Sequence, residues 1–256
     1  MQKNVKYALM QYVPSFERDE KINVAVILHS TSDKYLSIKL IENWKRLKEF
    51  DDEIDIEFMK NYLKAFKEQF NYNPLNINNI DINDEMLIEK MTQYYINQFI
   101  FKISEISIES SCEEFLEKLK NNYLYLDVDK KKRVSKKENI EFFGEILRGK
   151  NIQYELVGGK NSLVGNYNEK INVDMKIQGK YYKIINFNDS NISTYIPVIK
   201  MWMMNALELK ENKEELIFIV SEQIIDEKIN TFIKMLEKYG KVVKMSEFND
   251  YFNNYK

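Results

Sequence analysis

Three segments of the N-terminal half carry the hydrophobic pattern of β-strands. Residues 5–13 (VKYALMQYV) predict a first strand that Pro14 ends, because proline lacks the N–H that a β-ladder needs. Residues 23–28 form a short continuous run rich in Val and Ile, which predicts a strand buried on both faces. Residues 35–40 alternate and are predicted to pair with that strand as a hairpin, across the turn residues of 30–33.

After these strands the spacing of the apolar residues changes to three and four. Residues 54–70 predict an amphipathic helix. Its apolar residues are Phe58, Met59, Tyr62, Leu63, Phe66 and Phe70. We also predict a short helix over 84–91, a strand over 98–108 and a helix over 112–123. The last of these follows two serines that can cap it and has acidic residues in its first turn.

The basic run of residues 129–137 (DKKKRVSKK) has no apolar pattern and marks a predicted domain boundary. We therefore predict a first domain over 1–128, a linker over 129–137 and a second domain over 138–256. In the second domain, segments with the apolar spacing of helices alternate with segments with the apolar pattern of strands. Its predicted elements are a helix to about 149, strands at about 152–157, 171–177 and 181–187, a helix at about 193–209, a strand at 216–220, a helix at 226–239, a strand at 241–245 and a short aromatic helix at the end.

This order predicts the fold class of each domain. The first domain is predicted to be α+β, with a small mixed or antiparallel sheet. The second is predicted to be α/β, because a helix that links two non-adjacent strands indicates a right-handed crossover within one sheet. The whole chain is therefore expected to hold an α+β domain followed by an α/β domain.

Composition narrows the class of protein. The formal net charge of −2 excludes a basic field over the whole protein, although a local basic patch stays compatible with it. The single cysteine excludes an internal disulfide, and the single histidine excludes two-histidine metal sites. No apolar run reaches about 18 residues and no signal peptide opens the chain, so we expect a cytoplasmic protein without a membrane partner. The sequence leaves the oligomeric state open.

A long signature surrounds the buried strand. Its residues are Tyr12-Val13-Pro14, then Arg18, Glu20, Asn23, Val24, Val26 and Leu28, then Arg46-Leu47 and Phe50. With them, residues 5–126 resemble an uncharacterised bacterial family catalogued as a domain of unknown function. Its members carry Tyr-Val-Pro and then Arg-x-Glu-x-x-Asn-Val-x-Val-x-Leu. The resemblance implies no activity, but such members are often found beside genes for kinases similar to the HipA toxin and in mobile or defence-type neighbourhoods.

The element order of residues 135–245 is similar to the restriction-endonuclease-like core, which runs helix, three strands, helix, strand. That family binds Mg²⁺ through an Asp on the second strand and an acid-x-Lys on the third. Asp174 and Lys183 lie on the matching predicted strands, but Tyr181 stands where the second acid would be. Because one carboxylate holds Mg²⁺ poorly, the resemblance implies an inactive nuclease-like domain, unless Glu155 supplies the second acid.

The signature residues Arg18, Glu20 and Asn23 form the candidate binding site. Arg18 can form paired hydrogen bonds with a carboxylate or phosphate of a ligand. In the structural alternative, Arg18 pairs with Glu17 or Glu20 and fixes the turn into the strand, while Asn23 satisfies backbone groups of the loop. The residues fit both interpretations.

The basic run is the candidate nucleic-acid patch. Its side chains can contact phosphates by charge alone. As a solvated linker they need no partner, which is the alternative interpretation. The patch comprises Lys130, Lys131, Lys132, Arg133, Lys136 and Lys137.

Four further features fit a structural role more simply than a functional one. His29 is a candidate acid or base without a partner nearby in the sequence. Cys112 opens a helix but has no candidate base histidine. Residues 158–162 (GGKNS) lack the glycine spacing of a P-loop and predict a hairpin turn. Residues 201–204 (MWMM) predict a helix buried on most sides, with a Met-rich partner surface as the alternative.

The absence of a complete catalytic set favours a non-enzymatic binding or regulatory protein without a cofactor. The resemblance implies a role in bacterial–phage or mobile-element conflict, for example as a phage-encoded inhibitor of host defence that contacts a protein or nucleic acid. One alternative is a metal-dependent DNA nuclease in which Asp174 and Glu155 hold Mg²⁺ beside Lys183. Another is a partner or antitoxin-like regulator of a HipA-like kinase.

Overall fold

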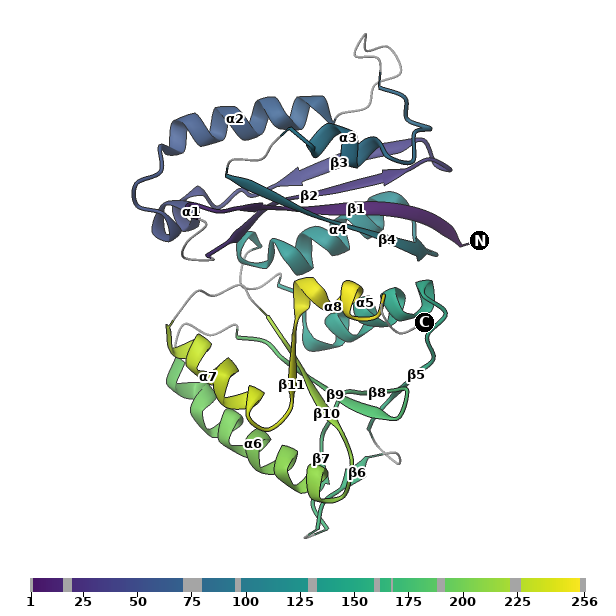
Figure 1. The fold of residues 1–256 in the computed structure, drawn as a ribbon, viewed down its shortest axis with the longest axis vertical. Helices are drawn as coiled ribbons and strands as arrows, with labels where there is room; N and C mark the ends of the chain where they lie inside the picture. The colour runs from purple at the N-terminus through teal and green to yellow at the C-terminus, as the bar shows by residue number, and fades with distance from the viewer. Residues whose placement is uncertain are drawn as a thin grey trace. The chain divides into compact units, whose positions relative to one another are not determined.

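The computed structural model of the chain divides into two compact units, Met1–Ser135 (unit 1) and Lys136–Lys256 (unit 2). The division falls inside the predicted linker, and each unit has a β-sheet of its own (Figure 1). Among the described residues, no helix is long and apolar enough to cross a membrane. The structure describes residues 2–15, 20–70, 80–94, 98–128, 133–158, 162–166, 168–187, 192–221 and 227–253.

Unit 1 is built on a four-stranded antiparallel sheet in the order β3-β2-β1-β4. The strands are β1 Lys3–Tyr12, β2 Ile22–Ser30, β3 Tyr35–Leu40 and β4 Phe99–Ile108. The hairpin of β2 and β3 is confirmed, and so is the burial of β2. Figure 1 shows the reason for this burial: α2 and α3 lie on one face of the sheet and α4 lies on the other.

The helices of unit 1 follow the local signals of the sequence in all cases but one. They are α1 Trp44–Phe50, α2 Ile56–Gln69, α3 Leu87–Thr92 and α4 Cys112–Tyr123, followed by the 3-10 turn η1 Tyr125–Asp127. Helix α4 begins at a capping box in which Ser111 and Glu114 each bond the other's backbone N–H. Helix α1, of seven residues, lies outside every predicted element.

Unit 2 has a mixed five-stranded sheet in the order β11-β10-β9-β8-β5, with β9, β10 and β11 parallel and β5, β8 and β9 antiparallel. A separate two-stranded sheet pairs β6 with β7. The elements of unit 2 are α5 Lys136–Gly149, β5 Tyr154–Leu156, β6 Leu163–Val164, β7 Lys170–Ile171, β8 Met175–Ile177, β9 Lys180–Ile185, η4 Ile192–Thr194, α6 Tyr195–Glu211, β10 Leu216–Val220, α7 Glu227–Glu237, β11 Lys241–Lys244, η5 Met245–Glu247 and α8 Phe248–Tyr251.

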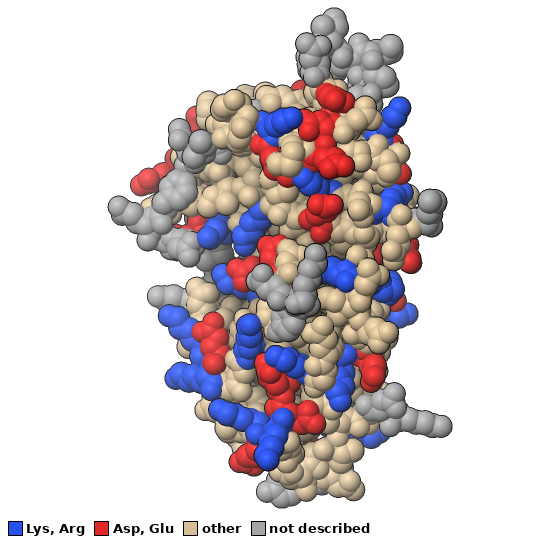
Figure 2. Space-filling model, turned by 45° about the vertical axis from the view of Figure 1, so that its right-hand side comes forward, with Lys and Arg blue, Asp and Glu red and all other residues tan. Residues whose placement is uncertain are grey.

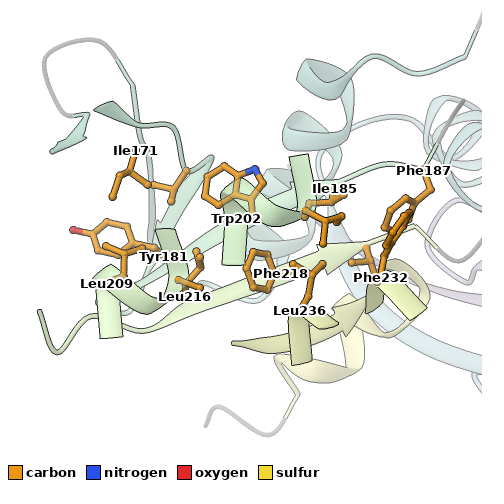
Figure 3. Close-up of a cluster of buried hydrophobic side chains, with 14 of the residues drawn as sticks. Ile171, Tyr181, Ile185, Phe187, Trp202, Leu209, Leu216, Phe218, Phe232 and Leu236 are labelled. Carbon is orange, nitrogen blue, oxygen red and sulfur yellow. The ribbon is translucent and has the colours of Figure 1, made fainter. Parts of the chain in front are cut away.

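Helices cover both faces of this sheet (Figure 1). On one face, α6 and α7 bury an apolar cluster in which Trp202 meets Phe218 edge-on and Phe187 stacks with Phe232 (Figure 3). On the other face, Phe143 of α5 lies 4.3 Å, centroid to centroid, from Phe248 of α8. Both units are therefore mixed α and β structures, as predicted.

One prediction in unit 2 is wrong. The single strand expected over 171–177 is two strands of different sheets, because the chain leaves the ladder after Ile171 and rejoins the main sheet only at Met175. The alternation of apolar residues continues across the break and hides it. The hairpin turn predicted over 158–162 stays a prediction, because residues 159–161 lie outside the described residues.

Candidate functional site

Asn23, the signature residue at the start of β2, connects this strand to β1 and to the end of α4. Its side-chain carbonyl accepts a hydrogen bond of 2.8 Å from Gln11, and its amide donates one of 3.0 Å to the backbone carbonyl of Tyr123. A β-bulge at Val24 shifts the register so that Asn23 lies opposite Gln11. The side chain of Asn23 therefore has partners within the fold, as in the structural interpretation.

Of the two charged members of the candidate binding site, the structure describes only Glu20. Glu20 is exposed, and no described hydrogen bond or ion pair reaches it. Arg18, with its predicted partner Glu17, lies outside the described residues. The binding role of these three residues therefore stays a prediction.

The described members of the basic run have partners. Arg133 lies over the ring of Tyr125, 5.0 Å from its centroid. Lys137 lies 3.7 Å from Glu141 within α5, and Lys136 forms an ion pair with Asp174. Lys130, Lys131 and Lys132 lie outside the described residues. On the face that Figure 2 draws, basic and acidic side chains are interspersed, so this face offers no extended basic field to nucleic acid.

Asp174 and Lys183, two of the nuclease candidates, meet in a buried ion pair. Asp174 precedes β8 and faces Lys183 of β9, whose Nζ lies 3.5 Å from Asp174 Oδ1. Lys136 Nζ, at the start of α5, lies 2.5 Å from the same oxygen. Asp174 Oδ2 accepts a hydrogen bond of 2.8 Å from the backbone N–H of Ile184. Both oxygens of this carboxylate are thus occupied by partners of the protein itself.

Lys183 is as enclosed as its carboxylate partner. Its Nζ donates to the backbone carbonyl of Asn172 at 2.6 Å and lies 4.3 Å from the ring centroid of Trp202. Burial lowers the pKa of Lys183 to about 8; Asp174 opposes this shift and the neighbouring ammonium of Lys136 adds to it. The cluster joins α5, the start of β8, β9 and α6, so it ties both helical layers of unit 2 to the sheet.

The lowered pKa of Lys183 makes the stability of unit 2 depend on pH. In the unfolded chain the Lys183 ammonium has a pKa of about 10.5, whereas in the folded chain its pKa is about 8. Between these two pH values the folded chain has lost this proton and the unfolded chain still holds it. Because the unfolded state then binds more protons, the free energy of unfolding rises with pH across that window. We expect wild type to gain stability there relative to Lys183→Met, as measured by urea unfolding on both sides of the window. A stability difference that is constant with pH would contradict this assignment.

No contact between Glu155 and Asp174 is described, so the proposed pairing of these two acids stays a prediction. Glu155 is exposed on β5, and its register partner is Lys176, while Asp174 lies directly before the start of β8. Among the described residues, no group of three or more His, Cys, Asp and Glu side chains is placed to hold a metal ion. Mg²⁺ prefers several oxygen ligands in octahedral geometry, and an Asp174 carboxylate already bound by two ammonium groups does not fit that requirement.

His29 and Cys112 are buried on β2 and at the start of α4. His29 Nε2 lies 2.9 Å from the backbone carbonyl of Ile82, so this nitrogen donates and fixes the segment before α3. The Cys112 thiol donates to Asp33 at 3.3 Å, and burial with this carboxylate raises the pKa of Cys112 to about 11. At neutral pH Cys112 is therefore a thiol and a poor nucleophile.

A cavity of about 670 Å³ borders His29 in unit 1. Its two lysines are already paired, Lys3 with Asp33 and Lys6 with Glu89. These ion pairs compensate the charges that would otherwise attract a charged ligand. The cavity therefore adds no defined ligand chemistry to His29.

The outer face of helix α6 is the largest departure from expectation. The prediction that residues 201–204 lie on a helix buried on most sides is wrong: Trp202 is buried, but Met201 and Met204 are 49% and 66% exposed. The sheet covers only the inner side of α6, through Ile199, Trp202, Ala206 and Leu209. The outer face of α6, defined by its exposed apolar residues, consists of Ile196, Val198, Met201, Met204 and Leu207.

The sequence carries one signal for this face. Helix α6 has apolar residues all round its circumference, whereas α2, α4 and α7 have a polar side. A helix of that kind is either buried or covered by a partner, and the sequence pattern does not distinguish the two cases. The exposure of Met204 in the structure shows that α6 is not buried on that side.

Residues 7 and 123, the two ends of a long segment of unit 1, lie next to each other in the structure. The ring of Tyr7, on β1, stacks on the ring of Tyr123, at the end of α4, with 6.3 Å between centroids. Residues 7–123 match the family model of DUF3037, a protein of unknown function. The DUF3037 segment covers most of unit 1 and supports an uncharacterised domain in the N-terminal half. No curated protein and no solved structure matches the chain.

Proposed function

We propose that this chain is a non-enzymatic binding protein that contacts a protein partner through the outer face of α6. The observation that carries the proposal is the set of five exposed apolar side chains on that one helix. A contiguous apolar surface is costly in water and is typical of sites that another molecule covers. The two methionines suit such a site, since their flexible, polarisable side chains adapt to a partner.

The attachment of α6 favours binding without rearrangement. Trp202 on the inner side is 2% exposed and packs against Phe218 of β10, which fixes the helix on the sheet. A partner therefore meets a preformed surface, and little backbone entropy is lost when it binds. Most of the ordering cost falls on side chains such as Met204.

A metal-dependent nuclease is the second candidate, and one observation favours it. Asp174 and Lys183 lie side by side, as expected for the Asp and Lys of the restriction-endonuclease-like core that residues 135–245 resemble, although β6 and β7 interrupt the three strands of that order. The side chains present argue against this candidate, because Asp174 already contacts two lysines and a backbone N–H, and Tyr181 stands in place of the second acid. For this reason we place the chain among binding proteins.

The biological setting is a further part of the proposal. The family resemblance supports a regulatory role in bacterial–phage or mobile-element conflict, with a HipA-like kinase as the alternative partner. Both settings are compatible with a protein-binding face on α6. The gene neighbourhood distinguishes them, since a prophage or defence operon favours the first and an adjacent kinase gene favours the second.

Site-specific photo-crosslinking tests the proposed face. A photoreactive amino acid at position 204 is expected to give a defined protein adduct in cells that produce the chain. The matched control is position 58, because Phe58 is 65% exposed on α2 and so is equally accessible. Adducts at position 58 but none at position 204 would contradict the proposal.

The competing enzyme is tested in parallel with a plasmid-cleavage assay containing Mg²⁺ or Mn²⁺. We expect no cleavage above background. Cleavage by wild type that Asp174→Asn abolishes, at a temperature at which both proteins remain folded, would overturn the binding-protein proposal in favour of the nuclease.

A further inference from the structure

We infer that the partner of the outer face of α6 is a second copy of this chain, bound with the two α6 helices antiparallel around a two-fold axis at Met204. This inference rests on the proposed function and names its partner. It follows from the order of side chains on α6. When a second α6 runs in the opposite direction, apolar residues lie opposite apolar residues and each lysine lies opposite a glutamate.

The apolar positions match first. Residues three and four apart lie on one face of a helix, so Met201 and Leu207 flank Met204 at three residues on either side. In an antiparallel pair centred on Met204, Met201 of one copy lies opposite Leu207 of the other, and the two Met204 side chains meet. The centre of such an interface is entirely apolar, as is typical of the buried core of protein interfaces.

The charged positions then select the antiparallel direction. Lys200 and Glu208 lie four residues before and after Met204. Antiparallel pairing sets Lys200 of each copy opposite Glu208 of the other, whereas parallel pairing would oppose Lys200 to Lys200 and Glu208 to Glu208. Opposite charges at the rim favour one register and like charges penalise the wrong one.

Both side chains are available for this pairing. Lys200 is exposed and has no ion-pair partner within the described part of the chain. Glu208 Oε1 accepts a hydrogen bond from the backbone N–H of Asn166, which leaves Oε2 free to accept from another donor. The Asn166 contact also restrains the Glu208 side chain, so less of its rotamer entropy is lost on pairing.

The same charges argue against other occupants. With Lys200 and Glu208 both on it, the face has no excess of one sign, so it has no electrostatic preference for nucleic acid or for a strongly charged peptide. The helix has 17 residues, which corresponds to about 25 Å at 1.5 Å per residue. That is long enough for its apolar centre to be flanked by a charged pair on each side.

Sedimentation equilibrium of the purified chain tests the inference. We expect a monomer–dimer equilibrium that Met204→Glu weakens by roughly a hundredfold or more, because it opposes two carboxylates at the axis. Phe58→Glu, the same class of change on exposed α2, is expected to leave the dimer unchanged. Circular dichroism confirms that each variant is folded.

Charge reversal tests the register. Lys200→Glu and Glu208→Lys are each expected to weaken self-association by roughly tenfold, because two attractive pairs become repulsive. An equimolar mixture of these two variants, and the double variant that carries both changes, restore opposite charges across the axis. Both are expected to associate more tightly than either single variant alone.

Failure of this inference and failure of the proposed function are distinguishable. A monomer at all concentrations that still gives an adduct with another protein from position 204 overturns the dimer and leaves the binding function intact. A monomer without any adduct from position 204 overturns both. A dimer that Met204→Glu leaves unchanged, or single reversals that the mixture does not rescue, would show that the copies associate elsewhere or in another register.

Discussion

Asp174→Ala is expected to lower the free energy of unfolding of unit 2 by about 3–5 kcal/mol, because it leaves a buried ammonium without its carboxylate. The Lys183 side chain is only 10% exposed, and Asp174 Oδ1 lies 3.5 Å from its Nζ. The substitution also removes the acceptor of the Ile184 backbone N–H, which is buried at that point of the sheet. An unsatisfied buried donor adds a cost of its own.

Urea unfolding followed by tryptophan fluorescence measures this effect directly. Trp202 lies against Lys183, so its emission reports unit 2, and a Trp44→Phe background removes the signal of unit 1. Glu155→Ala is the matched control, because Glu155 is exposed on the neighbouring strand β5 and is expected to change stability by about 0.5 kcal/mol at most.

A double variant shows how much of the cost is the orphaned charge. Asp174→Ala with Lys183→Met removes both charges and keeps an apolar chain over Trp202. We expect it to be more stable than Asp174→Ala alone by about 1–3 kcal/mol. If the two substitutions are simply additive, the pair does not stabilise unit 2 in the way the geometry indicates.

Phe248→Ala is expected to destabilise unit 2 by about 3–5 kcal/mol, because it leaves a cavity between α5, α8 and the sheet. Phe248 has no exposed surface; its ring lies 4.3 Å from that of Phe143 and 5.1 Å from that of Phe252, centroid to centroid. Helix α8 has only four residues and is held by these contacts rather than by its own hydrogen bonds.

The loss is expected in the unfolding transition that Trp202 reports. Phe58→Ala provides the control, since the same residue type is removed from an exposed position and costs at most about 0.5 kcal/mol. Equal effects of the two substitutions would mean that the aromatic cluster under α8 contributes little.

Local signals account for the elements that the sequence predicted well. The capping box of Ser111 and Glu114 places the start of α4, and the apolar runs of β2 and β10 are long and uninterrupted. Both kinds of signal lie within a few residues of the element they define. Their physical cause is present in the chain segment itself, so no distant residue is needed to interpret them.

The break after Ile171 shows where such signals end. Apolar and polar residues alternate over 171–177 as in a single strand. In the structure, however, the backbone carbonyl of Asn172 accepts a hydrogen bond from Lys183 Nζ, and the Asp174 carboxylate accepts one from the backbone N–H of Ile184. These bonds join positions ten or eleven apart, so they depend on how β9 folds back against β8. The resemblance identified Asp174 and Lys183 as a pair, but only the tertiary structure shows that Lys136 and the backbone N–H of Ile184 also contact this carboxylate.

The sequence by itself determined that the chain holds two mixed α and β units, where most helices and strands lie, and that residues 201–204 belong to an apolar helix. Only the tertiary structure decided which side of that helix meets water. Because α6 carries apolar residues on every side, their spacing does not select the inner side. The sheet makes that choice by burying Trp202 and leaving Met201 and Met204 exposed.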